Sequence, residues 1–224
     1  MNRMQKAGGI AAIANSAIFL AAMVVFFTLF SGDGAETSGD PFQDVAFVAE
    51  NTNLLYTFYL VVYVAWAMLL VVVALAWHDL IAAAAPALAR IAMVFGVIWA
   101  GLIIATGMVA GIAFTVVADL YDTDPVQAGQ VWQIVTVVTR GIGGEIEIVG
   151  GAWILLGSIA TVRAGGSAKA LGYCGAAVAV AGIMTVVPAL RAVGGPIFGI
   201  GTTVWFAWLG VVILRRRPQR PATA

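Results

Sequence analysis

Long apolar stretches separated by short polar segments are the main pattern of this chain. A membrane hydrocarbon core of about 30 Å requires about 20 helical residues. Stretches of about this length lie at residues 9–30, 54–77, 91–117, 141–161, 170–190 and 197–214. The pattern predicts an all-α fold, a polytopic membrane helical bundle with six transmembrane helices. The first stretch is longer than the apolar core of a signal peptide, so we expect it to be a retained helix.

The segments between these stretches are short and leave no room for a separate soluble domain. We therefore predict a single six-helix transmembrane domain over residues 1–214, followed by a basic cytoplasmic tail over residues 215–224. The composition agrees, because 62% of the residues are hydrophobic and 10% are charged. A soluble domain carries about 25% charged residues.

The net charge is zero, but the charges are sorted by side. With six spans, one side receives the basic residues Arg3, Lys6, Arg90, Arg163, Lys169, Arg215, Arg216, Arg217 and Arg220. The other side receives the acidic residues Asp33, Glu36, Asp40, Asp44, Glu50, Asp119, Asp122 and Asp124. Basic loops stay in the cytoplasm, so both termini are predicted to be cytoplasmic. The C-terminal arginines indicate an anchor on anionic lipid and not a nucleic-acid site.

Two similar segments indicate an internal repeat. Asp40-Pro41-Phe42-Gln43 and Asp124-Pro125-Val126-Gln127 lie 84 residues apart. In each, Asp is suited to cap a helix and Pro to take its first position. A helical-hairpin repeat, in which the first two spans correspond to the third and fourth, is therefore a further hypothesis.

Charged residues within the apolar stretches are the strongest pointer to a site. An acidic side chain at the centre of a membrane helix costs about 2.5–3.5 kcal/mol, yet Glu145 and Glu147 lie inside the run Arg140–Gly151. Tyrosines follow one face of the second span, and Arg191 ends the fifth. We predict that these residues form one polar cluster, with either a ligand-binding or a structural role: Arg140, Glu145, Glu147, Arg191, Tyr56, Tyr59 and Tyr63.

The glycine spacing in the fourth stretch predicts a close-packed face. Gly143, Gly150 and Gly157 recur every seven residues, and small residues at such spacing let membrane helices approach closely. Glu147 is three or four residues from Gly143 and Gly150, so it shares that face, while Glu145 points away from it. We expect an arginine, Arg140 or Arg191, to hold Glu147. The Gly143/Gly150/Gly157 face is the predicted contact with a second copy or a partner membrane protein.

Two interpretations of the polar cluster stay open. In the structural one, arginine and glutamate pair to lower their insertion cost, and the tyrosines form an interfacial belt. In the functional one, the cluster lines an outward-facing polar cavity, and the protein is a membrane-embedded sensor or scaffold that binds a small ligand, a lipid or a partner. The alternative is a small-solute or ion transporter or channel that uses the Arg/Glu cluster of the fourth span.

The scarcity of reactive residues limits the chemistry. The chain has one cysteine, Cys174, and one histidine, His78. An internal disulfide, a cysteine metal cluster and a bis-histidine haem site are thereby excluded. The sequence shows no catalytic triad or phosphate-binding loop. We predict no enzymatic activity, no cofactor and no metal site.

Several stretches carry a family resemblance: residues 4–10, 144–153, 170–173 and 200–210. They resemble a bacterial family of six-helix integral membrane proteins that is catalogued only as a domain of unknown function. The resemblance extends over the whole chain and implies the same six-helix fold. It carries no reaction, substrate or cofactor. The overall prediction is a multi-pass protein of a bacterial plasma membrane.

Overall fold

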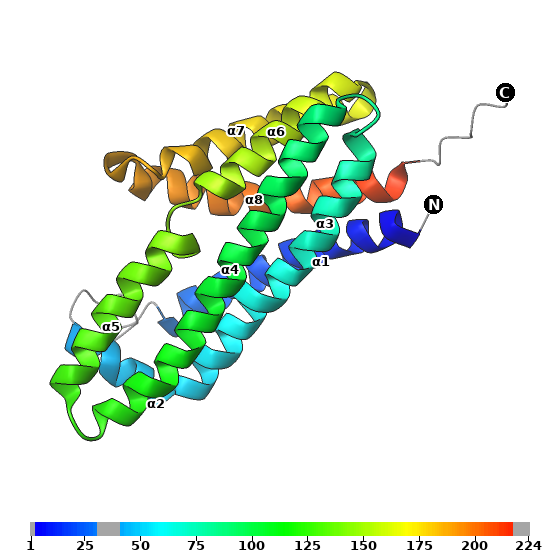
Figure 1. Ribbon diagram of the computed structural model, residues 1–224. Coiled ribbons are helices and arrows are strands. Elements are labelled where there is room, and N and C mark those ends of the chain that lie inside the picture. The colour runs from blue at the N-terminus through cyan, green and yellow to red at the C-terminus, as the bar shows by residue number, and fades with distance from the viewer. Residues whose placement is uncertain (1–2, 31–40, 217–224) are drawn as a thin grey trace, which may run out of the picture. The chain divides into compact units, whose positions relative to one another are not determined.

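The structure is a computed structural model that describes residues 3–30 and 41–216 (Figure 1). The described residues form helices and turns, without a strand. Six helical segments are long and apolar enough to cross a membrane: Arg3–Thr28, Gln43–Ile81, Pro86–Tyr121, Pro125–Ala164, Gly166–Met184 and Pro188–Arg215. The predicted all-α fold with six transmembrane helices is therefore confirmed.

Helices of three kinds make up these segments. The α-helices are α1 (Arg3–Val25), α2 (Pro41–Tyr59), α3 (Trp66–Ile81), α4 (Pro86–Tyr121), α5 (Pro125–Thr139), α6 (Ile148–Ala164), α7 (Lys169–Met184) and α8 (Pro188–Arg215). Three wider π-helical segments follow α1, α2 and α5, at Phe26–Phe30, Leu60–Ala65 and Arg140–Gly144. A short 3₁₀ turn at Gly166–Ala168 precedes α7.

Proline marks the start of four of these helices. The helices α2, α4, α5 and α8 each begin at a proline. Proline has no backbone N–H, and this costs nothing at a helix start because the N–H groups of the first turn have no partner within the helix. At α5 the predicted cap is confirmed, since the Asp124 carboxylate accepts a hydrogen bond of 3.0 Å from the Gln127 backbone N–H. The corresponding Asp40 lies outside the described residues.

The predicted boundary between the fifth and sixth spans is wrong. We placed the turn at residues 191–196, but it lies at 185–187, between α7 and α8. Pro188 begins α8 and does not kink the preceding helix. Arg191 therefore lies in the first turn of α8. Pro196, expected in the turn, is inside this helix, where membrane helices tolerate proline.

The chain packs as two compact units. The first unit contains the described residues up to Ala17, Leu69–Trp99, and the described residues from Glu147 onward. The second unit contains the described residues of Ile18–Met68, together with Ala100–Ile146. The predicted single domain over residues 1–214 stays a prediction.

A cluster of tryptophans forms the core of the first unit. Helix α7 packs against α6 and against α8 (Figure 1). The Trp77 ring lies 5.2 Å from that of Trp153 and 4.9 Å from that of Trp205, measured between centroids. All three side chains are fully buried. Such edge-to-face contacts add to the stabilisation that burial provides.

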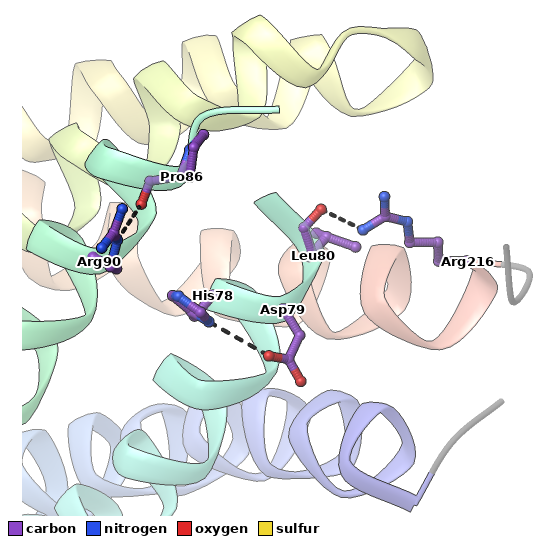
Figure 2. Close-up of polar contacts among 6 residues, drawn as sticks. All are labelled: His78, Asp79, Leu80, Pro86, Arg90 and Arg216. Atoms are coloured by element: carbon purple, nitrogen blue, oxygen red, sulfur yellow. Dashed lines mark hydrogen bonds and ion pairs between the residues drawn. The ribbon is translucent and has the colours of Figure 1, made fainter. Parts of the chain in front are cut away.

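The two ends of the described chain meet in the first unit. The Gln5 side-chain amide donates to the carbonyl oxygens of Ile213, at 2.7 Å, and of Arg216, at 2.6 Å. The Arg216 guanidinium in turn donates to the Leu80 carbonyl at the end of α3 (Figure 2). A cation at this position satisfies a carbonyl that the helix leaves unbonded. Nearby, His78 contacts the adjacent Asp79 carboxylate at 3.4 Å.

The second unit has its own apolar core, built from α2, α4 and α5. Its buried residues are Val45, Val48, Leu55, Ala110, Ala113, Phe114, Val117, Ala128 and Trp132. The Phe114 ring is central, because it contacts both Tyr59 and Trp132. This packing fixes the helices around the cavity described next.

Candidate functional site

A cavity of about 210 Å³ lies within the second unit. We call it the second-unit cavity. Its polar lining consists of Thr106, Thr136, Thr139 and Arg140. Its aromatic lining consists of Phe26, Tyr59, Tyr63 and Trp132, and Ala110, Val135 and Gly144 complete the wall. The cavity thus combines apolar rings with hydroxyl groups and one cation, as small-molecule sites commonly do.

All three π-helical segments of the described chain border this one cavity. They contribute Phe26, Tyr63, and the pair Arg140 and Gly144. A π-helical turn widens the backbone and is less stable than an α-helical one, so it occurs mostly as single turns, frequently at functional sites. Their convergence on one cavity favours a functional role for it.

Two of the predicted tyrosines line the cavity, and the third does not. The rings of Tyr59 and Tyr63 are stacked, with centroids 4.7 Å apart and planes at 12°. Both rings belong to the cavity wall. Tyr56 lies outside it and is 45% exposed. Its ring covers Gly111, where an added Cβ would lie 3.2 Å from the ring.

Two polar atoms at the cavity lack partners among the described residues. These are the indole Nε1 of Trp132 and the hydroxyl of Thr136. In contrast, the hydroxyls of Thr106 and Thr139 donate to backbone carbonyls of their own helices, at 2.9 and 3.0 Å. Buried donors usually have partners. A bound molecule could supply them here.

Arg140 lines the cavity, whereas Glu145 and Glu147 do not. The helix breaks between these residues. Gly143 has non-helical torsions, φ 170° and ψ 7°, and Glu145, Ile146 and Glu147 belong to no helix. The predicted continuous fourth helix is therefore wrong. The predicted position of Glu147 on the face of Gly143, and the opposite direction of Glu145, lose their basis because helical periodicity does not extend through the break.

Glu147 lies in the first unit, where it bonds to Trp99 of α4 and to Thr185 at the end of α7. Its carboxylate accepts a hydrogen bond of 3.2 Å from the Trp99 indole of α4. Its backbone N–H donates to the Thr185 hydroxyl at 2.8 Å. The Arg191 Nε donates to the Thr185 carbonyl at 3.1 Å. Thr185 thus joins the start of α6 to the end of α7 and the first turn of α8.

The predicted ion pair between Glu147 and Arg191 is not found. Within the described residues of the first unit, the Glu147 carboxylate bonds to Trp99 and forms no ion pair. Thr185 bonds to both residues, through its hydroxyl to the Glu147 N–H and through its carbonyl to the Arg191 Nε. Arg140, the other proposed partner, belongs to the second unit. That alternative stays a prediction.

The glycine face is filled from within the same chain. An added Cβ at Gly150 would lie 2.5 Å from the Trp99 ring, and one at Gly157 would lie 2.2 Å from the Trp77 ring. In the second unit, Gly143 is buried against Thr106. The close packing that we predicted is present, but the groups packed there belong to this chain. These glycines are therefore not available as a contact with another protein.

Sequence reasoning missed most of the polar residues around the cavity. Trp132, Thr136 and Arg140 follow one another at intervals of four in the sequence, so they share one face of α5. This spacing could have identified Trp132. Thr106 on α4 has no comparable signal, because its neighbours are apolar and its hydroxyl bonds to its own helix.

Comparison of the chain with protein-family models, curated proteins and solved structures gives no match. The class of protein therefore follows from the fold alone. Six apolar helices of spanning length define a multi-pass membrane protein, with a lipid bilayer as its surroundings.

Proposed function

We propose that this protein is a sensor or scaffold of the bacterial plasma membrane that binds a small ligand in the second-unit cavity. The observation that carries the proposal is the convergence of three π-helical segments on one cavity with unpartnered polar atoms. Membership of the bacterial six-helix family is part of the same proposal. It rests on the stretches of sequence named above.

We propose further that the second-unit cavity opens outward and that both termini are cytoplasmic. The contacts of Gln5 with Ile213 and Arg216 support this, because both ends of the described chain then lie at one end of the first unit. An even number of spans produces that arrangement. The positive-inside rule assigns this basic end to the cytoplasm.

Reporter fusions test the orientation. A phosphatase fused after residue 220 is expected to be inactive, because it stays in the cytoplasm. The same enzyme inserted within residues 33–40 is expected to be active, because this segment precedes α2 on the opposite side. The reverse pattern would contradict the proposed orientation.

Cysteine labelling tests whether the second-unit cavity is open to water. Thr139→Cys places a thiol in the cavity wall, and Cys174→Ala removes the native thiol. A small, charged thiosulfonate added outside is expected to react at position 139 at least ten times faster than at Val137→Cys. Val137 is 73% exposed and would face lipid. Equal rates at the two positions would mean that the cavity is not an outward-facing, water-filled site.

The broken fourth span favours a second candidate function. Discontinuous helices at mid-membrane are typical of transporters, whose sites they form, and here α5 and α6 are separated by residues 140–147. A small-solute transporter would release its ligand on the other side of the membrane. Flux of a bound compound into proteoliposomes distinguishes it from a sensor, which binds the compound without moving it.

A further inference from the structure

The charge of the second-unit cavity selects for an anion. Among the described residues that line the cavity, Arg140 is the one charged at neutral pH, and none is acidic. Among the described residues, no carboxylate lies within ion-pair distance of the Arg140 guanidinium. A cation within a membrane span is costly unless it is paired. A bound anion would compensate it.

The hydrogen-bond donors lie in a row along α5. Trp132 and Thr136 belong to α5, and Arg140 directly follows it with helical torsions, φ −62° and ψ −38°. At intervals of four residues, the three side chains share one face. At 1.5 Å per residue, this row extends over about 12 Å. Trp132 is 4% exposed, and its indole N–H has no partner among the described residues. Thr136 and Arg140, about one turn apart, offer donors to an anionic oxygen, and Trp132, two turns from Arg140, offers a donor to a polar group at the other end of a ligand.

The other walls suit a flat apolar body. The stacked pair Tyr59 and Tyr63 forms one of them, and Phe26 adds a further ring. Aromatic rings favour offset-stacked or edge-to-face contact with another ring. The volume is about 210 Å³, whereas an engineered apolar cavity of about 150 Å³ holds a benzene ring. A ring with one small substituent therefore fits.

We infer that the second-unit cavity binds a small aromatic monocarboxylate, with the carboxylate at Arg140 and the ring against Tyr63 and Trp132. This inference rests on the proposed function, because it names the ligand of the same cavity. A guanidinium binds a carboxylate through two parallel hydrogen bonds. The hydroxyls of Thr106 and Thr139 already donate to backbone carbonyls, so their oxygens are left as acceptors. They can accept a hydrogen bond from a hydroxyl group on the ligand's ring.

Three compounds with one ring and different charge test this assignment. Benzoate, benzyl alcohol and benzylammonium are titrated by calorimetry into the full chain, held in nanodiscs of zwitterionic lipid. Benzoate is expected to bind at least ten-fold more tightly than benzyl alcohol, as a charge-assisted hydrogen bond allows. Benzylammonium is expected to bind most weakly, because Arg140 repels it.

Arginine variants identify the group that selects the anion. Arg140→Gln is expected to weaken benzoate binding at least ten-fold and benzyl alcohol binding much less, so that the preference for benzoate is lost. Arg140→Lys keeps the charge and is expected to retain part of the preference. Arg163→Gln is the matched control, because Arg163 is an exposed arginine near the end of α6 and outside the cavity. It is expected to keep the full preference.

The contrary outcomes separate the two proposals. If none of the three compounds binds, the aromatic ligand class fails, and labelling of Thr139→Cys decides separately whether the cavity is an open site as the proposed function requires. If benzyl alcohol binds as tightly as benzoate, or Arg140→Gln has no effect, the cavity stands and the anion assignment fails. If phosphatidylglycerol stabilises the native chain through Arg140 while benzoate does not bind, the anion is a lipid headgroup and the aromatic assignment is overturned.

Discussion

Replacing Gly157 with alanine is expected to lower the melting temperature of the purified protein by on the order of 5 °C. An added Cβ would lie 2.2 Å from Cη2 of Trp77, which no real contact allows. The ring cannot withdraw easily, because Trp77 is 1% exposed and packs edge-on against Trp153 and Trp205. Overpacking of this kind costs about 1–3 kcal/mol, and each kcal/mol corresponds to about 2–4 °C at this chain length.

Gly101→Ala is the matched control for this substitution. Gly101 also lies inside a long helix, α4, but nothing lies within 4 Å of an added Cβ there. Because alanine favours a helix over glycine by up to about 1 kcal/mol, the control is expected to keep or raise the melting temperature. Thermal unfolding in detergent, followed by loss of monodisperse protein, measures both. Equal losses in the two variants would show that Trp77 does not restrict position 157.

Hydrophobic length and proline position were sufficient to predict most of the fold. The spans need about 20 apolar residues whatever their partners are, so local sequence determines their number. Asp124 and Pro125 likewise act within one helical turn, and the predicted cap is confirmed. Between the fifth and sixth spans, a glycine-rich segment next to Pro196 resembled a turn. Pro188, eight residues earlier, begins the helix instead.

The break after α5 could not be predicted, because glycine has two opposite uses in a membrane helix. Gly143 was interpreted as a small residue that allows close packing, and it is buried against Thr106 as that interpretation requires. It also has backbone torsions that no α-helix has. Only the contacts with α4 decide between the two uses. Every prediction that carried helical periodicity from Arg140 to Glu147 depended on this choice.

The candidate site was predicted in part. Tyr59, Tyr63 and Arg140 were identified because aromatic or charged residues are conspicuous in an apolar chain, and they line the second-unit cavity. Glu147 was conspicuous for the same reason, but it contributes to the packing of the first unit. Trp99, which donates to it, lies in an apolar stretch with no polar neighbour. Its role depends on Gly150, whose missing Cβ admits the indole ring.

Replacing Thr185 with valine is expected to destabilise the first unit more than replacing Thr203 with valine does. The Thr185 hydroxyl accepts from the Glu147 N–H at 2.8 Å and donates to the Gly182 carbonyl at 2.6 Å. Valine keeps the shape and removes both bonds. The Glu147 N–H precedes α6, so it has no partner within that helix, and water is scarce in the membrane interior. A stranded buried group costs about 1–3 kcal/mol.

Two further variants separate the hydrogen bond from the shape of the side chain. Thr185→Ser keeps the hydroxyl and is expected to retain most of the stability that Thr185→Val loses. Thr203→Val is the second control, because its hydroxyl bonds only to the Gly199 carbonyl four residues earlier in the same helix. That carbonyl is positioned to accept a backbone hydrogen bond as well. Thr203→Val is therefore expected to lower the free energy of unfolding by about 0.5 kcal/mol or less. Denaturation of the three variants in detergent measures the difference. If Thr185→Val is no less stable than Thr203→Val, the Thr185 hydroxyl does not hold α6 and α7 together.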